Sequence, residues 1–111
     1  MMTLDKADAK GYPLQVRNVR FADPALEALL KEGVIVSEAV TKAFRKRVQL
    51  ILDSKDERDF YGFKSLHYEK LKGGREHQHS MRLNEKYRLI LEYEGNGPDK
   101  AVVIVGIEDY H

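Results

Sequence analysis

The sequence has 111 residues, 42% of them apolar, which suits one domain around a single hydrophobic core. It contains no cysteine, so disulfides, thiolate nucleophiles and cysteine-bound metals are excluded. Residues 1–11 lack the apolar run of a secretory signal, and no segment is apolar enough to span a membrane, so we expect a cytoplasmic protein. The formal charge of +1 by itself indicates no general attraction to nucleic acid.

The start of the chain predicts an extension followed by a strand. We assign residues 1–13 to an N-terminal extension and residues 14–111 to a single domain. Apolar residues over the range 14–21 approach the alternation of a short strand.

Two helices are predicted next. Asp23-Pro24 is a strong helix start, because aspartate accepts hydrogen bonds from exposed N–H groups and proline suits the first helical position. Gly33 is the expected end of this helix. Ser37 caps a second helix that runs to about Asp53 with apolar residues at helical spacing. With about three connecting residues, the two helices are expected to form an αα-hairpin.

The remaining chain predicts a loop and three strands. Residues 53–63 combine charges with three aromatic side chains, and we interpret them as a loop that packs its aromatics onto the core. Apolar residues then alternate over 80–83 and 87–93, and 101–107 is an apolar run typical of a strand buried on both faces. The expected fold class is α+β: an N-terminal strand, a two-helix hairpin and a three-stranded antiparallel meander completing one small sheet.

The small net charge hides a basic region at residues 64–91. Seven basic residues minus three acidic ones leave +4 there, so the rest of the chain carries −3. The basic residues are Lys64, Lys70, Lys72, Arg75, Arg82, Lys86 and Arg88.

Two arginines of this region are expected on one face of the hairpin. Arg82 and Arg88 both lie opposite the apolar positions of their strands, so their guanidinium groups can share the solvent face and grip a phosphate. Alternation alone also demands polar residues there, so ordinary surface positions are the plainer interpretation.

Histidines and the end of the sequence offer proton-transfer groups. His77 and His79 are spaced to share a strand face and could bind a metal with His67, although we interpret them as polar surface and expect no metal or cofactor. The sequence ends in Asp109-Tyr110-His111, which supplies a carboxylate, a phenol and a group titrating near neutral pH. The ends of protein chains are often solvated and irregular, so the alternative interpretation is that these residues have no function.

Three segments together resemble a known family, the HigB branch of the RelE/ParE toxin superfamily. They are residues 66–75, with a segment of the type L-K-G-x-R, residues 79–89, with a strand of the type S-I-R-[IV]-N-x-x-[WY]-R-[IL], and the terminal D-Y-H. The resemblance implies the toxin of a type II toxin–antitoxin pair, which cleaves messenger RNA on the ribosome. It also implies a helix-turn-helix antitoxin, similar to HigA, as partner.

Site residues follow from the resemblance position by position. The terminal motif implies cleavage roles for Asp109, Tyr110 and His111, and Arg88 matches a phosphate ligand of the transition state. Lys72 and Arg75 match the basic residues of the L-K-G-x-R segment. His67 precedes that segment at a greater distance than the catalytic histidine of some relatives.

These residues suggest a metal-independent mechanism. His111, Asp109 and His67 transfer protons during attack by the 2′-OH, while Arg88 and Arg82 hold the phosphoryl oxygens and Tyr110 contacts the nucleotide. RNA phosphates are expected to contact the other basic residues of the region, Lys64, Lys70, Lys72, Arg75 and Lys86. A poison of DNA gyrase, as in the ParE branch, and a non-catalytic RNA-binding module are the alternative functions.

Overall fold

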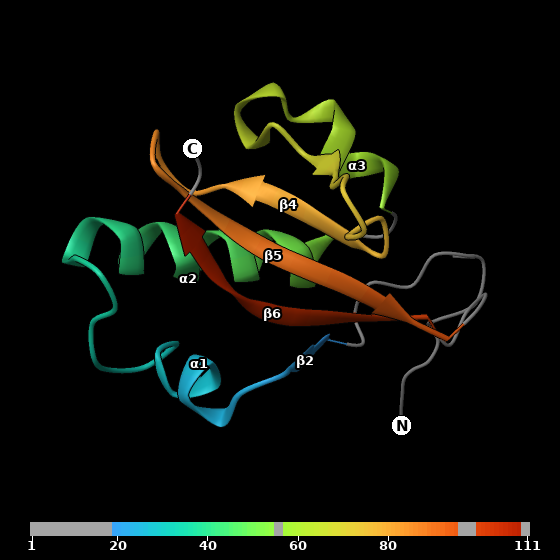
Figure 1. The fold of residues 1–111 in the computed structure, drawn as a ribbon. Coiled ribbons are helices and arrows are strands. Elements are labelled where there is room, and N and C mark those ends of the chain that lie inside the picture. Colours follow the sequence, from blue (N-terminus) through green and yellow to red (C-terminus); the bar gives the residue numbers. More distant parts are fainter. Residues whose placement is uncertain (1–18, 55–56, 96–99, 110–111) are drawn as a thin grey trace.

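The computed structural model describes residues 19–54, 57–95 and 100–109, which form an α+β fold with one sheet (Figure 1). The elements in chain order are β2 (Val19–Phe21), α1 (Pro24–Ala28), α2 (Glu38–Asp53), α3 (Arg58–Gly62), the 3-10 helix η1 (Lys64–Leu66), β3 (Glu69–Lys70), β4 (Gln78–Arg82), β5 (Tyr87–Glu94) and β6 (Ala101–Asp109). No helix in these ranges is long and apolar enough to cross a membrane.

The sheet has five strands in the order β2-β6-β5-β4-β3. The predicted meander is confirmed, since β4, β5 and β6 pair antiparallel in succession, and the predicted fold class is correct. Two details differ from the prediction. First, β2 pairs with β6 in the parallel direction. Second, the sheet contains a further strand, β3, which was not predicted because its two residues are too few to show a periodic pattern. Residues 14–18 of the predicted first strand lie outside the described residues.

The core lies between α2 and one face of the sheet, with α2 crossing behind the strands in Figure 1. The apolar stripe of α2 is fully buried, and the apolar positions of β4, β5 and β6 face it. These residues are Val40, Phe44, Val48, Ile51, Met81, Leu83, Leu89, Leu91, Val102 and Ile104. The alternation therefore predicted the core faces of β4 and β5 correctly.

Both predicted helix starts are confirmed. The Asp23 carboxylate accepts a hydrogen bond from the Ala25 N–H at 2.9 Å, and the Ser37 hydroxyl accepts one from the Val40 N–H at 3.2 Å. Each cap satisfies an N–H group that has no partner inside its own helix.

The predicted end of the first helix at Gly33 is wrong. α1 ends at Ala28, and the chain continues through tighter i→i−3 hydrogen bonds, so residues 29–37 rather than about three residues connect α1 to α2. Arg45 of α2 holds this connection by donating to the Leu29 carbonyl at 2.6 Å and to the Gly33 carbonyl at 3.2 Å. Such a contact between distant segments has no local sequence signal.

The predicted loop at residues 53–63 is also wrong, because α3 occupies residues 58–62. Of its aromatic residues only Phe60 is buried, whereas Tyr61 and Phe63 are 56% and 49% exposed. The expectation that all three pack onto the core therefore holds for Phe60 alone. A helix of one turn presents too few residues for a helical period to be recognised.

A bulge in β6 determines which side chains reach the open face of the sheet. Leu91 pairs with Ile104 and Leu89 pairs with Ile107, so β6 has one residue more than β5 between these pairs. Ile104 and Ile107 both pack towards the core as a result. Glu108 then shares a face with its partner Arg88, because neighbouring residues of a strand point to opposite faces.

Candidate functional site

Arg88 is the centre of the polar groups on the open face. Its side chain bridges two elements, since Nη2 donates to the His67 carbonyl and Nε donates to the Ser80 hydroxyl at 2.7 Å. Arg88 is only 5% exposed. The prediction that this guanidinium faces the solvent is therefore wrong. The two hydrogen bonds hold the side chain between β5 and the segment before β3.

His67 links Arg88 to Arg82. It lies between η1 and β3 with a positive φ of 46°, in the left-handed region that few non-glycine residues adopt. Its Nε2 lies 3.2 Å from Nη1 of Arg82. A guanidinium can only donate, so Nε2 must accept this bond, which corresponds to a neutral ring that carries its proton on Nδ1. The three residues predicted to share a site, His67, Arg82 and Arg88, therefore lie together.

Two small cavities adjoin Arg88. The first, which we call the His67 cavity, has a volume of about 280 Å³. Its lining is His67, Glu69, Arg82, Asn84, Glu85 and Arg88. The second, the Arg75 cavity, has a volume of about 200 Å³. Its lining is Leu71, Arg75, Ser80, Arg88, Ile90, Glu108 and Asp109. Arg88 lines both, so a phosphate and its neighbouring ribose can approach it from two sides.

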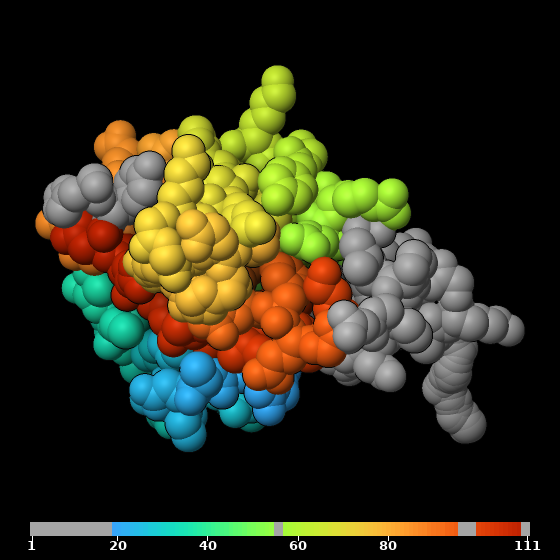
Figure 2. Space-filling view, turned by 45° about the vertical axis from the view of Figure 1, so that its right-hand side comes forward, coloured from blue at the N-terminus to red at the C-terminus, as the bar shows by residue number. Residues whose placement is uncertain are grey.

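Arg75 reaches this face from the segment between β3 and β4, which Figure 2 shows in yellow over the sheet. It makes two hydrogen bonds to the Glu108 carboxylate, at 2.9 and 2.7 Å, and Nε donates to Gln78 at 2.8 Å. The bonds to Glu108 raise the pKa of the Arg75 guanidinium further. A bidentate pair of this kind presents Arg75 in one fixed orientation beside the cavity.

The predicted lysines lie around the two cavities rather than in them. All four are exposed, and none contributes to the described linings. They are Lys64, Lys70, Lys72 and Lys86. Their arrangement suits contacts to a large phosphate-rich surface better than contacts to a reacting phosphate.

Only the first residue of the terminal motif can be placed. Asp109 ends β6 opposite Tyr87, contributes to the Arg75 cavity and lies 3.9 Å from the Lys86 ammonium. Tyr110 and His111 lie outside the described residues.

Sequence reasoning missed several polar groups of the site. The Glu69 carboxylate lies 3.8 Å from the Arg88 guanidinium in the His67 cavity, and Glu108 holds Arg75. The sequence prediction gives neither residue a role. Glu69 is the residue of β3 that pairs with Ser80, so recognition of that strand would have placed it beside Arg88.

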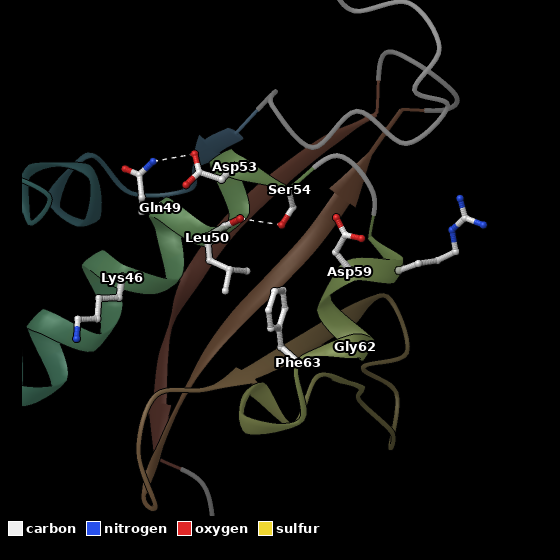
Figure 3. A pocket seen from close by; sticks show the side chains of 9 residues that line it. Lys46, Gln49, Leu50, Asp53, Ser54, Asp59, Gly62 and Phe63 are labelled. Carbon is white, nitrogen blue, oxygen red and sulfur yellow. Dashed lines mark hydrogen bonds between the residues drawn. The ribbon is translucent and has the colours of Figure 1, made fainter.

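A larger cavity, about 750 Å³, lies elsewhere, between α2 and the segment that begins with α3. Figure 3 shows Leu50 of α2 and Phe63, the residue after α3, pointing towards this gap, with Asp53 and Asp59 at the rim. It holds none of the predicted site residues among its described lining, and its two basic and two acidic groups offer no net attraction to a phosphate.

His77 and His79 do not join His67. His77 lies 3.6 Å from Glu92, whereas His79 stacks on Tyr68 with ring centroids 5.1 Å apart. Within the described residues, no three histidine or carboxylate side chains gather as they do around a metal ion.

Acidification is expected to destabilise the fold through His79. Burial lowers the pKa of this imidazole below its ordinary value of about 6.5, Lys70 and Lys100 lower it further, and Glu57 opposes them. Below about pH 6.5 the unfolded chain therefore binds more protons than the folded chain, and the free energy of unfolding falls as the pH drops. Urea unfolding between about pH 7.5 and about pH 5.5 measures this decline.

Two variants isolate the contribution of His79. His79→Phe keeps an aromatic ring against Tyr68 without a titrating group, so its stability is expected to decline less on acidification. His77→Asn, at a side chain that is 63% exposed, is expected to decline as the unchanged protein does. An equal decline in all three proteins contradicts the assignment to His79.

Comparisons with known proteins agree with the geometry. The family model described as the RelE-like toxin HigB of type II toxin–antitoxin systems matches residues 20–111. Among solved structures, a YoeB/ParE toxin from Agrobacterium tumefaciens is similar in fold, with a TM-score of 0.53 and 11% identity over 85% of this chain and 99% of that one. No curated protein sequence matches. The family model covers most of the chain, and the chain therefore belongs to the HigB family of RelE-like toxins, which implies an antitoxin as partner.

Proposed function

We propose that the protein is a ribosome-dependent endoribonuclease that cleaves messenger RNA without a metal and so inhibits translation. The observation that carries this proposal is the meeting of His67, Arg82 and Arg88 beside the end of β6, where the terminal motif begins. Family membership supports a toxin, and these residue types supply what cleavage by a 2′-OH requires.

His67 is the better candidate for the base. Its bond from Arg82 suits a neutral ring with a lone pair on Nε2, and a neutral imidazole can take the proton from the 2′-OH. A phosphate that binds Arg82 frees this lone pair. His111 then protonates the 5′-oxygen that leaves, with Asp109 orienting it and Tyr110 against the nucleotide.

The arginines stabilise the phosphorane that forms between these two proton transfers. Arg88 and Arg82 bind its non-bridging oxygens, and Arg75 extends the same positive surface. The exposed lysines contact ribosomal and messenger phosphates, so binding weakens as salt rises. A helix-turn-helix antitoxin similar to HigA silences the toxin in the cytoplasm.

A translation extract supplied with the purified protein tests this function. Primer extension is expected to find new 5′ ends in messenger that is being translated, and none when initiation is blocked. Cleavage that is independent of translation contradicts the ribosomal role. DNA breaks with purified gyrase favour a gyrase poison, and binding without either product favours a non-catalytic RNA-binding module.

A further inference from the structure

Tyr68, the residue after His67, is held by contacts of both its ring and its hydroxyl. The Tyr68 ring is 7% exposed and stacks on His79 with an interplanar angle of 12°. Phe60 and Tyr61 contact it edge to face, with centroids 5.3 and 4.8 Å away. The ring is therefore enclosed by aromatic side chains from α3 and β4.

The hydroxyl of Tyr68 is held as well as its ring. It donates to the Glu57 carboxylate at 3.0 Å, so the bond to the Tyr93 hydroxyl, at 2.5 Å, is donated by Tyr93. Lys100 fixes the other carboxylate oxygen of Glu57 at 3.3 Å. Burial, Tyr93 and Glu57 raise the pKa of the Tyr68 phenol, which keeps the donated proton in place.

This anchor acts directly on the backbone of His67. A non-glycine residue with φ of 46° is strained and persists only where its surroundings impose it. Tyr68 imposes it from one side, and Arg88, which donates to the His67 carbonyl, does so from the other. The mechanism proposed above uses His67 and Arg88 but gives no role to the Tyr68 hydroxyl.

We propose that Tyr68 is a positioning residue: its hydroxyl, held by Glu57 and Tyr93, keeps His67 in the conformation that aligns both the imidazole and Arg88. The effect on cleavage rests on the proposed function, whereas the effect on the geometry of Arg88 does not. The anchor lies with α3 and the ends of β4 and β5, apart from the described linings of both cavities.

Conservative substitutions separate the hydroxyl from the ring. Tyr68→Phe removes the hydroxyl and keeps the aromatic packing, and Tyr93→Phe removes the second hydroxyl should Tyr68→Phe fail to fold. Tyr61→Phe is the matched control, because it makes the same chemical change in a neighbouring ring that is 56% exposed.

The first measurement needs no activity. The Nε–H NMR signal of Arg88, assigned by its loss in Arg88→Lys, is expected to shift and exchange faster with water in Tyr68→Phe and Tyr93→Phe. It is expected to stay unchanged in Tyr61→Phe. An unchanged Arg88 signal in a folded Tyr68→Phe protein overturns the proposal, whatever the protein cleaves.

The second measurement is messenger cleavage at varied ribosome concentration. Tyr68→Phe is expected to lower kcat by about 10- to 100-fold, the effect of a misplacement of about 1 Å, with KM nearly unchanged. Equal kcat in Tyr68→Phe and Tyr61→Phe overturns the catalytic consequence. If the unchanged protein cleaves nothing, the proposed function fails, while the Arg88 signal still decides the geometric part.

Discussion

His111→Ala is expected to reduce messenger cleavage on the ribosome by about 10²- to 10⁴-fold, the usual contribution of a general acid. An alkoxide is a poor leaving group, so a proton must reach the 5′-oxygen as its bond to phosphorus breaks. His111 stands two positions beyond Asp109, the β6 residue that contributes to the Arg75 cavity with Arg88. Single-turnover cleavage of ribosome-bound messenger, measured by primer extension, gives the rate.

Two further variants test whether His111 acts by transferring a proton. His77→Ala, at an exposed histidine 3.6 Å from Glu92, is expected to cleave as the unchanged protein does. His111→Gln retains a hydrogen-bonding side chain but cannot transfer a proton, so it is expected to be as slow as His111→Ala. Cleavage by His111→Gln at the unchanged rate contradicts a role in proton transfer.

Local chemistry made much of the fold predictable. The caps at Asp23 and Ser37 depend on neighbouring N–H groups, and the core faces of β4 and β5 depend on a period of two. Each of these features depends on residues that lie within a few positions of one another in the sequence. Arg45 binding to the Leu29 carbonyl, by contrast, joins residues 16 positions apart and shortens the first helix in a way that no local pattern records.

The sequence predicted that His67, Arg82 and Arg88 belong to one site, but it did not predict how they are arranged. Alternation correctly placed Arg88 opposite the core, but its burial depends on the carbonyl of His67, 21 positions away. The bulge in β6 brings Glu108 to the face of Arg88, and a continuous apolar run gives no sign of such a bulge. Hydrogen bonds between distant segments therefore decide how each side chain is presented, and local motifs do not record them.

Arg88→Ala is expected to damage both stability and cleavage, which makes Arg88 the most demanding residue to interpret. Its removal leaves the His67 carbonyl and the Ser80 hydroxyl without their donor, at a cost of about 1–3 kcal/mol for each buried group. The loss of a charged donor to the phosphorane is expected to slow cleavage by about 10²- to 10³-fold as well. Urea unfolding and single-turnover cleavage measure the two effects separately.

Arg88→Lys separates charge from shape. A lysine keeps the positive charge, but its single ammonium group cannot donate to His67, Ser80 and a phosphate at the same time. Cleavage by Arg88→Lys is therefore expected to be at least tenfold slower than cleavage by the unchanged protein. Arg82→Ala is the matched comparison on the partner strand, where the guanidinium is more exposed and its loss is expected to lower activity with little change in stability. If Arg88→Lys restores stability and cleaves at the unchanged rate, the fork has no part in the transition state and Arg88 contributes only its charge.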